Sequence, residues 1–335
     1  MAEAVQLFRM MNSKDSHALQ VGISILTCSC RNSLENRKLF AKVALARLRK
    51  SSKLKRSQRW MGRLKQYGKD GGTLMSETMA VPLISVITIT LNDRDGLIRT
   101  IESLQSQIDM PDVEHVVVDG LSDYDIDSLI ADIGSPARLH QGRDEGLYDA
   151  MNRGTELARG DYLLYLNSGD TLAEQQVLAE IGAVLAAERP DFLYCDSFER
   201  QLDGEIRYKP SRPMKWLPLG MISHHQAMLF RRDVIEQNAI RYDLSYRIAA
   251  DYDFVLHHVR VSKSSHYLPR PICVFERGGT SYQKRHVARR EQFHIRRTFY
   301  NSTVFAAAVY FMQWVLRSFR GLFPAGYWAL RKLLG

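Results

Sequence analysis

The chain has 335 residues, of which 45% are hydrophobic and 25% charged, and this composition is typical of a folded globular protein. The net charge of +9 is uneven, because residues 31–70 carry +12 and residues 284–335 carry +9, whereas residues 71–283 carry −12. The four cysteines form no disulfide or zinc pattern, and no apolar run reaches the ~20 residues of a membrane-spanning helix, so we exclude a disulfide scaffold and expect a cytoplasmic protein.

The first 80 residues show no alternation of strands and helices. Leucine and valine recur loosely among lysine and arginine between residues 39 and 64, which indicates a basic helix, and residues 69–73 indicate a linker. Residues 1–80 are therefore predicted to be a basic helical N-terminal extension outside the catalytic core. Basic segments suggest an anionic partner, either nucleic acid or anionic lipid.

From Pro82 onward the pattern becomes that of an α/β domain, which we place at residues 81–283. Continuous β-branched or apolar runs alternate with segments of helical periodicity, which predicts a doubly wound, mostly parallel sheet flanked by helices. The expected strands are 83–91, 113–118, 161–166, 192–196 and 227–230, and the expected helices are 96–105, 126–133, 147–158 and 173–187.

Polar side chains follow three of the expected strands where each strand ends. They are Asn92 and Asp93, then Asp119 and Asp123, then Asn167, Ser168 and Asp170. Ligands of such sheets bind beyond the carboxyl ends of the strands, so we expect these groups to form one site. The chain has neither G-x-G-x-x-G after its first strand nor a P-loop, so a divalent cation held by carboxylates is the expected source of phosphate neutralisation.

Residues 284–335 are predicted to form basic amphipathic helices. The apolar run 304–316 is too short to span a bilayer, and aromatic residues mingle with arginine and lysine on both sides of it. This mixture favours helices that lie in a membrane interface. The alternative is a helix that docks on the core or on a second subunit.

Seven segments together resemble family 2 glycosyltransferases with the GT-A fold, and most resemble bacterial exopolysaccharide enzymes of the colanic-acid type. The segments are SVITITLN at 85–92, VVVDGLSD at 116–123, DEGLYDAMNRG at 144–154, YLNSGD at 165–170, HHQAMLFRR at 224–232, RIAADYDF at 247–254 and FERGGTS at 275–281. The resemblance implies an inverting transfer of a sugar from a nucleoside-diphosphate sugar to a lipid-linked saccharide acceptor, with Mg²⁺ or Mn²⁺ as cofactor.

The resemblance also implies which residues bind the donor. Asp119 matches the aspartate that contacts the nucleobase, although a helix N-cap is the structural alternative. Asp123, Asp144 and Asn152 match positions near the donor. For Asp123 the alternative is a simple turn, and for Asn152 a hydrogen bond between helix and strand is an equal alternative. Two strand-end amides complete the predicted donor site, namely Asn92 and Asn167.

Asp170 occupies the place of the metal-binding aspartate in a D-x-D-type motif. The motif departs from the family pattern, because Asn167 and Gly169 stand where many relatives have aspartate. His225 is a second candidate near the metal and the diphosphate. These departures leave open a catalytically inactive relative.

Asp251 matches the catalytic base, which removes a proton from the acceptor hydroxyl. Ala250 replaces the acidic residue that precedes this aspartate in the family, and Asp253 is a candidate contact to the acceptor. The basic C-terminal helices place the expected enzyme at the cytoplasmic face of the membrane as a peripheral protein. The remaining alternatives are a nucleic-acid-binding protein that uses the basic ends, and a sugar-phosphate nucleotidyltransferase, which the sequence NDRDG after the first strand disfavours.

Overall fold

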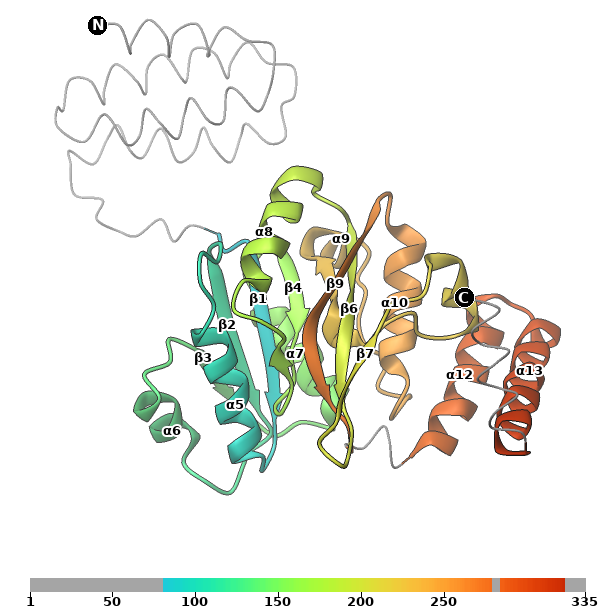
Figure 1. Cartoon of the computed structure of the whole chain (residues 1–335), viewed down its shortest axis with the longest axis horizontal. Helices are drawn as coiled ribbons and strands as arrows, with labels where there is room; N and C mark the ends of the chain where they lie inside the picture. Colours follow the sequence, from blue (N-terminus) through green and yellow to red (C-terminus); the bar gives the residue numbers. More distant parts are fainter. Residues whose placement is uncertain (1–80, 279–283, 323–335) are drawn as a thin grey trace, which may run out of the picture. The chain divides into compact units, whose positions relative to one another are not determined.

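The computed structural model describes residues 81–278 and 284–322, which form part of one compact unit that begins at Ala80. The predicted N-terminal extension of residues 1–80 lies outside the described residues, as do most of the GGTS loop and the aromatic and basic residues beyond 322. Within the described range, nine strands form one sheet in the order β3-β2-β1-β4-β8-β6-β9-β5, with β7 paired to β6 (Figure 1).

The first half of the sheet is parallel and follows the sequence pattern closely. Strand β1 (Ile84–Thr90) is buried along its whole length and pairs in parallel with β2 (Val113–Asp119) and β4 (Tyr162–Tyr165). Strand β3 (Arg138–Gln141) extends this half beside β2 and was not expected from the sequence. Because both faces of β1 are covered, its residues are all apolar or small, as in buried parallel strands.

The second half of the sheet mixes strand directions. Strand β8 (Met228–Arg231) runs antiparallel to β4 and to β6 (Phe192–Arg200), whereas β9 (Ser265–Glu276) runs parallel to β6. Short β5 (Thr171–Leu172) and β7 (Ile206–Lys209) are antiparallel additions. The mostly parallel, helix-flanked α/β sheet is confirmed, with β5, β7 and β9 unforeseen.

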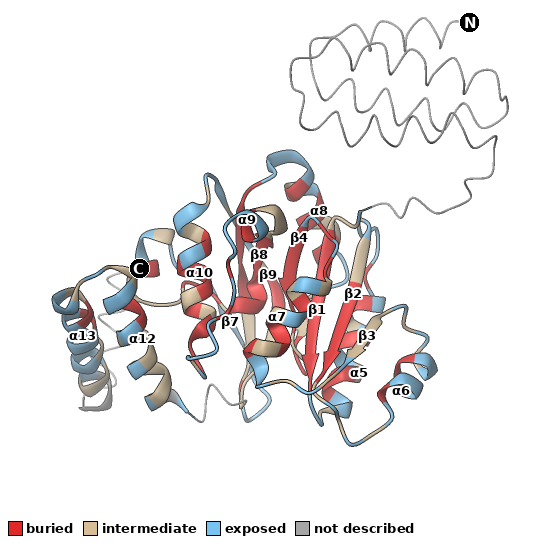
Figure 2. Cartoon of the chain, turned by 180° about the vertical axis from the view of Figure 1, so that it is seen from behind, coloured by how far each residue is buried: buried red, intermediate tan, exposed pale blue. Residues whose placement is uncertain are grey.

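Helices cover both faces of the sheet, and alternate residues of the strands point to them. Ile87 and Ile89 of β1 pack in a cluster with α7 (Leu147–Leu157) and α10 (Ala250–Val261), whereas Ile84 and Val86 pack towards α8 (Val177–Glu188). Helices α5 (Arg94–Gln105) and α6 (Ile126–Asp132) pack on β2 through Val117. Figure 2 shows the buried central strands between these helices.

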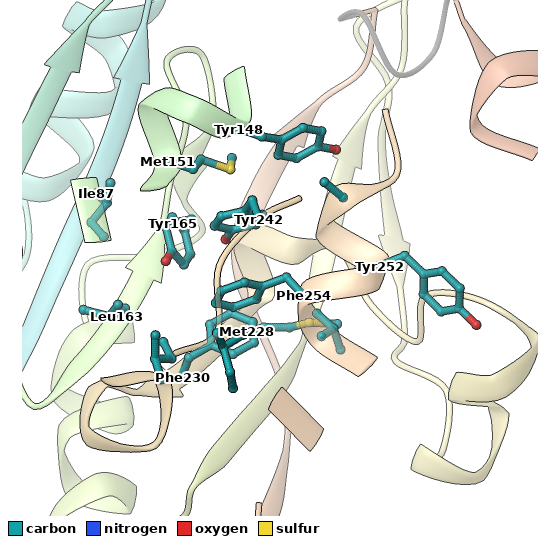
Figure 3. Close-up of a cluster of buried hydrophobic side chains, with 14 of the residues drawn as sticks. Ile87, Tyr148, Met151, Leu163, Tyr165, Met228, Phe230, Tyr242, Tyr252 and Phe254 are labelled. Atoms are coloured by element: carbon teal, nitrogen blue, oxygen red, sulfur yellow. The ribbon is translucent and has the colours of Figure 1, made fainter. Parts of the chain in front are cut away.

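Helix α7 approaches the sheet very closely. A Cβ atom at Gly154 would lie 2.4 Å from Cγ2 of Ile87, so any larger residue would push the helix off β1. This contact fixes the height of α7 above the sheet, and α7 carries Tyr148, Asp149 and Asn152. The same face holds an aromatic cluster in which Tyr148, Tyr165 and Tyr242 lie together (Figure 3).

The remaining elements complete the described chain. Short 3-10 helices η2 (Met214–Leu219) and η3 (His225–Ala227) precede β8, and α9 (Arg232–Gln237) follows it. Helices α12 (Arg285–Phe299) and α13 (Thr303–Leu322) pack against each other, and α12 packs on α10. Among the described residues, no helix is both long and apolar enough to cross a membrane.

Candidate active site

Asp119 ends β2 as a fully buried carboxylate with local partners. It accepts hydrogen bonds from the Ser122 hydroxyl at 2.6 Å, from the Ser122 amide at 3.1 Å and from the Gln141 side-chain amide at 3.3 Å. The following helix is capped by Asp125, whose carboxylate accepts from the Ser128 amide at 3.0 Å. The alternative that Asp119 serves as the N-cap of that helix is therefore wrong.

Asn92 and Asp123 join the ends of β1 and β2. The Asp123 amide donates to Oδ1 of Asn92 at 2.8 Å, and the Asn92 amide donates to the Ser122 hydroxyl at 2.8 Å. Asn92 has φ of 53°, a left-handed conformation that asparagine tolerates better than most residues. The two loops thus form one exposed edge beside Asp119, as the strand-end pattern predicts.

Asp144 lies against the same edge. A Cβ atom on Gly120 would stand 2.7 Å from Oδ2 of Asp144, so the carboxylate touches the backbone directly after Asp119. Its Oδ1 accepts from the Gly146 amide at 3.0 Å, which shapes the turn into α7. Asp144 also lines a pocket of ≈ 280 Å³ with Val118, residues 140–143, Asp149, Ala150 and Arg153.

Asn152 makes a structural contact. Its amide nitrogen donates to the Tyr242 carbonyl at 2.9 Å, and its amide oxygen accepts from the Tyr242 backbone amide at 2.9 Å. Both ends of the side chain are thereby used to hold the segment before α10 against α7. The partner is a loop rather than a strand, and donor binding by Asn152 stays a prediction.

The expected metal motif forms a tight turn after β4. The Asp170 amide donates to the Asn167 carbonyl at 3.0 Å, and Gly169 has φ of 93°, where a side chain would be strained. Thr100 of α5 supports the turn, because its hydroxyl accepts from the Gly169 amide at 3.1 Å and donates to the Asp170 carbonyl at 2.8 Å. The glycine in this motif is therefore explained by backbone geometry.

The Asp170 carboxylate is 4% exposed and is held by two donors. Gln226 donates its side-chain amide to Oδ2 at 2.9 Å, and the Glu276 backbone amide donates to Oδ1 at 2.9 Å. Burial, assisted by the carboxylates of Glu276 and Asp93 and opposed by these hydrogen bonds, raises the pKa of Asp170 to about 7. An incoming cation would stabilise the charged form of such a group.

The fit of this turn to a divalent cation rests on oxygen atoms. The side-chain oxygen of Asn167 is buried and has no hydrogen-bond partner in the described structure, so it can accept a ligand. Among residues 81–278 and 284–322, no group of three or more His, Cys, Asp or Glu side chains could hold a metal ion. The Asp170 carboxylate and the Asn167 amide oxygen are oxygen ligands of the kind that Mg²⁺ accepts beside phosphates and water.

His225 lies inside the aromatic cluster. Its Nε2 is 2.6 Å from the Tyr242 hydroxyl, and its ring packs on Tyr165, Phe230 and Phe254. Burial lowers the pKa of His225 to about 4, which keeps the ring neutral at pH 7. Its neighbour Gln226 makes the contact to Asp170 instead, and metal binding by His225 stays a prediction.

Asp251 is the second residue of α10 and is partly buried. Its Oδ1 accepts from the Tyr252 amide at 2.8 Å, and burial raises its pKa to about 6, whereas the Tyr252 amide and the Tyr148 side chain oppose that shift. A carboxyl group with this pKa is ionised at pH 7 yet basic enough to accept a proton. Asp253 instead lies 3.7 Å from Nε2 of His257, and its acceptor contact stays a prediction.

Side-chain contacts and one backbone step lead from the Asp170 turn to Tyr148 of α7. Gln226 bonds to Asp170, the adjacent His225 bonds to Tyr242, and Tyr242 stacks on Tyr148 with ring centroids 5.6 Å apart. Figure 3 shows Tyr148 and Tyr242 between α7 and α10. The contacts run from Asp170 through Gln226, His225 and Tyr242 to Tyr148.

Three supporting residues were not singled out from the sequence. Gln226 and Glu276 hold the Asp170 carboxylate, and Thr100 holds its turn. Gln226 could have been found, because it follows the two histidines in the matched segment HHQAMLFRR. Thr100 and Glu276 reach Asp170 across 70 and 106 residues, and the sequence gives no signal for these contacts.

The chain is similar to known proteins in sequence and in structure. The family model described as Glycosyl transferase family 2 matches residues 85–244. A PGL/p-HBAD biosynthesis glycosyltransferase of Mycobacterium tuberculosis is 35% identical over 181 residues, which are 52% of this chain and 69% of that protein. Succinoglycan biosynthesis protein ExoO of Rhizobium meliloti is 27% identical and matches 51% of this chain and 54% of that protein.

Solved structures share the fold at low sequence identity. S. aureus TarS 1-349 in complex with UDP-GlcNAc superposes with a TM-score of 0.55 at 17% identity, covering 70% of this chain and 72% of that one. A mannosyltransferase from Pyrobaculum calidifontis in complex with GDP-Man and Mn²⁺ gives a TM-score of 0.50 at 16% identity, covering 90% and 91%. These superpositions establish a common architecture for the whole α/β unit.

Proposed function

Because the chain belongs to glycosyl transferase family 2 and is therefore a glycosyltransferase, we propose that it transfers a sugar with inversion from a nucleoside-diphosphate sugar to a lipid-linked saccharide. The relatives named for PGL/p-HBAD and succinoglycan biosynthesis support a role in making an exopolysaccharide or cell-surface glycan. The observation that carries the proposal is the meeting of Asp119, Asp144 and the Asp170 turn at the carboxyl ends of β1, β2 and β4.

The nucleoside end of the donor belongs beside Asp119. Its carboxylate accepts hydrogen bonds from Ser122 and Gln141, and a base or ribose donor group would replace one of them. Asn92 and Asp123 lie at the exposed edge, and Asp144 touches the backbone after Asp119. TarS and the archaeal mannosyltransferase, which share the fold, were solved with UDP-GlcNAc and GDP-Man, and this supports a nucleotide-sugar donor here.

The diphosphate belongs beside the turn that ends at Asp170. The Asp170 carboxylate and the unpartnered amide oxygen of Asn167 would hold a Mg²⁺ or Mn²⁺ ion together with the donor phosphates. Such an ion supplies neutralisation of the charge that develops on the leaving diphosphate. The chain's own part is to keep Asp170 oriented through Gln226 and the Glu276 amide.

Asp251 is the group that we assign to proton transfer. In an inverting reaction the acceptor oxygen attacks the anomeric carbon, the bond to the diphosphate breaks, and the hydroxyl proton passes to the carboxylate. The partial burial of Asp251 suits this task, because its raised pKa of about 6 makes the carboxylate a stronger base than an exposed aspartate. Tyr148 restrains the carboxylate from the side of α7.

The C-terminal helices would bring this site to an anionic membrane surface. Helix α13 exposes an apolar face in which Phe311 and Trp314 are 62% and 54% exposed and stack with ring centroids 5.8 Å apart. Aromatic residues of this kind partition to the membrane interface. A lipid-linked acceptor would then meet the enzyme at the cytoplasmic face.

Basic residues accompany that apolar face. The pKa of Arg317 on α13 is lowered, first by partial burial and then by the positive charge of Arg289 on α12. The two arginines are therefore close enough to interact. Arg290 and Arg297 add positive charge to α12. Each basic residue near an anionic bilayer contributes about 1 kcal/mol of attraction, which supports a lipid partner for this surface.

The test is donor binding by calorimetry with UDP-, GDP- and dTDP-sugars, with and without Mn²⁺. We compare wild type, Asp170→Ala and the control Glu188→Gln, whose side chain is exposed at the end of α8. We expect one class of nucleotide sugar to bind to the wild type and to the control variant only when the metal is present. The Asp170→Ala variant should not show this binding. Absence of binding by every nucleotide sugar would overturn the proposal, and steeply salt-dependent DNA binding would favour the nucleic-acid alternative. A bound donor that is never turned over identifies an inactive relative.

A further inference from the structure

Helix α10, which carries Asp251, begins without a cap of its own. The residue at the N-cap position is Ala249, which has no side-chain acceptor. The first amide groups of a helix have no partner within the helix, and a buried helix start therefore needs an acceptor from elsewhere. The segment 247–249 and the position of Asp251 two residues later depend on that acceptor.

Glu291 of α12 supplies it. Its Oε1 accepts from the Arg247 amide at 2.8 Å, and its Oε2 accepts from the amides of Ile248 and Ala249, both at 2.9 Å. One carboxylate thus satisfies three consecutive amides that lie 42 to 44 residues away in sequence. A glutamate performs the same service within one helix in a capping box, whereas here it comes from a separate helix.

The opposite side of this segment is held by α7. The Tyr148 hydroxyl donates to the Ile248 carbonyl at 2.6 Å, so residue 248 is bound through its amide and through its carbonyl. The nearby Tyr148 side chain also lowers the pKa of Asp251. The segment before Asp251 is therefore clamped between α7 and α12, and neither partner is adjacent in sequence.

Helix α12 cannot slide along α10, because Arg296 anchors it. This side chain is fully buried, and its guanidinium donates to the carbonyls of Pro218 and Leu219 at 3.0 and 2.8 Å. Its Cζ also lies 5.3 Å from the centre of the Tyr252 ring on α10. The anchor sits five residues beyond Glu291 and keeps that carboxylate in register with the amides.

We propose that Glu291 is a positioning residue of the transfer reaction, which holds Asp251 at the acceptor through the backbone amides of residues 247–249. The inference rests on the proposed function, because it takes Asp251 as the base. Glu291 also acts on Asp251 through space, since its negative charge raises the pKa of that carboxyl. Tyr148 of α7 and Tyr242 before α10 also interact with Asp251, and both are neutral at pH 7, because a phenol ionises near pH 10 and burial raises their pKa further.

The test compares Glu291→Gln and Glu291→Ala with wild type and the exposed control Glu188→Gln. Glu291→Gln keeps the shape of the side chain but removes its charge and one acceptor oxygen. We expect kcat to fall roughly 10–100-fold, as for small misplacements of catalytic groups, with the donor KM unchanged. The acidic limb of the pH profile should also move to lower pH, because Asp251 loses a neighbouring negative charge. A purely structural defect would lower activity without moving that limb.

Hydrogen–deuterium exchange of the peptide 247–252 gives a readout that does not need activity. The amides of this segment should exchange faster in Glu291→Ala than in wild type, while a peptide from β1 stays unchanged. The positioning role would be overturned if amide exchange of this peptide is unchanged in Glu291→Ala. It would also be overturned if Glu291→Gln changes neither kcat nor the acidic limb of the pH profile. If exchange is faster in Glu291→Ala but the wild type transfers no sugar, the contact of Glu291 with residues 247–249 is supported and the proposed function is refuted.

Discussion

The two ends of the candidate site are assembled in different ways. At the nucleotide end, Asp119 bonds to Ser122 three residues later, and Asp144 bonds to Gly146 two residues later. At the base end, the segment before Asp251 is held by Tyr148 and Glu291, which lie 100 and 42 to 44 residues away. The first end also uses contacts between neighbouring strands, since Gln141 bonds to Asp119 and Asp123 bonds to Asn92, whereas the second exists only after α7, α10 and α12 have packed together.

This difference has a practical meaning for substitutions. A change at the nucleotide end should alter donor affinity without disturbing Asp251. A change at the base end should alter turnover while donor affinity stays the same.

Replacing the proposed base should have the largest effect. Asp251→Asn keeps the size of the side chain and removes its ability to take a proton, so kcat should fall about 10²–10⁴-fold. Donor affinity measured by calorimetry should stay within about twofold of wild type, because donor contacts are assigned to the other end. Retained turnover in this variant would place the base elsewhere.

The pH profile of the wild type should report the same group. The carboxylate of Asp251 is the active form, and its pKa is raised to about 6 by burial. Turnover at saturating donor should therefore be constant above pH 7 and fall about tenfold per pH unit well below pH 6. A profile that stays flat down to pH 4.5 would contradict the assignment. The measurement is kcat from initial rates between pH 4.5 and 8.

At the nucleotide end, Asp119→Asn should weaken donor binding about tenfold, because one strong hydrogen-bonded contact is worth roughly 1.5 kcal/mol. Asp123→Asn is the matched comparison, since Asp123 is exposed and hydrogen-bonds to Asn92 through its backbone amide, which the substitution keeps. We expect at most a twofold change there. Equal effects of the two substitutions on the donor dissociation constant would argue against a special role for the buried carboxylate.

The smallest effect should concern the membrane surface on α13. Replacing Phe311 and Trp314 by alanine removes exposed aromatic groups and should weaken binding to anionic vesicles several-fold in a flotation assay. Turnover on a water-soluble acceptor should not change, because neither residue belongs to the site. The double substitution Val81→Ala and Leu202→Ala, at exposed positions elsewhere, serves as a control. Equal vesicle binding by both double variants would count against the membrane surface.

The sequence is informative where a pattern is local. Strands β1, β2 and β4 follow from continuous buried runs, and their polar ends predicted the meeting of Asn92, Asp119 and the Asp170 turn. Strand β9 was missed because it contains Pro269 and Pro271, which argue against a central strand. Its register also shifts against β6 beside Asp196.

Contacts between distant segments could not be predicted. The departure at Gly169 looked like a loss of metal ligands, and the positive φ of that residue gives it a conformational reason. Ala250 looked like a loss of an acidic neighbour, yet Glu291 brings a carboxylate to the same helix start from α12. Nothing in the spacing of residues 249 and 291 signals that they meet, because the contact depends on how α12 docks.

The docking of α12 limits how such enzymes can be recombined. A chain cut after residue 283 would leave three amides before α10 and the carbonyls of Pro218 and Leu219 without the partners they have here. Chimeras that exchange tails between relatives to redirect them to other membranes would therefore also exchange the support of the catalytic segment. A chimera that replaces only α13 would keep Glu291 and Arg296, and therefore the support of the segment before Asp251.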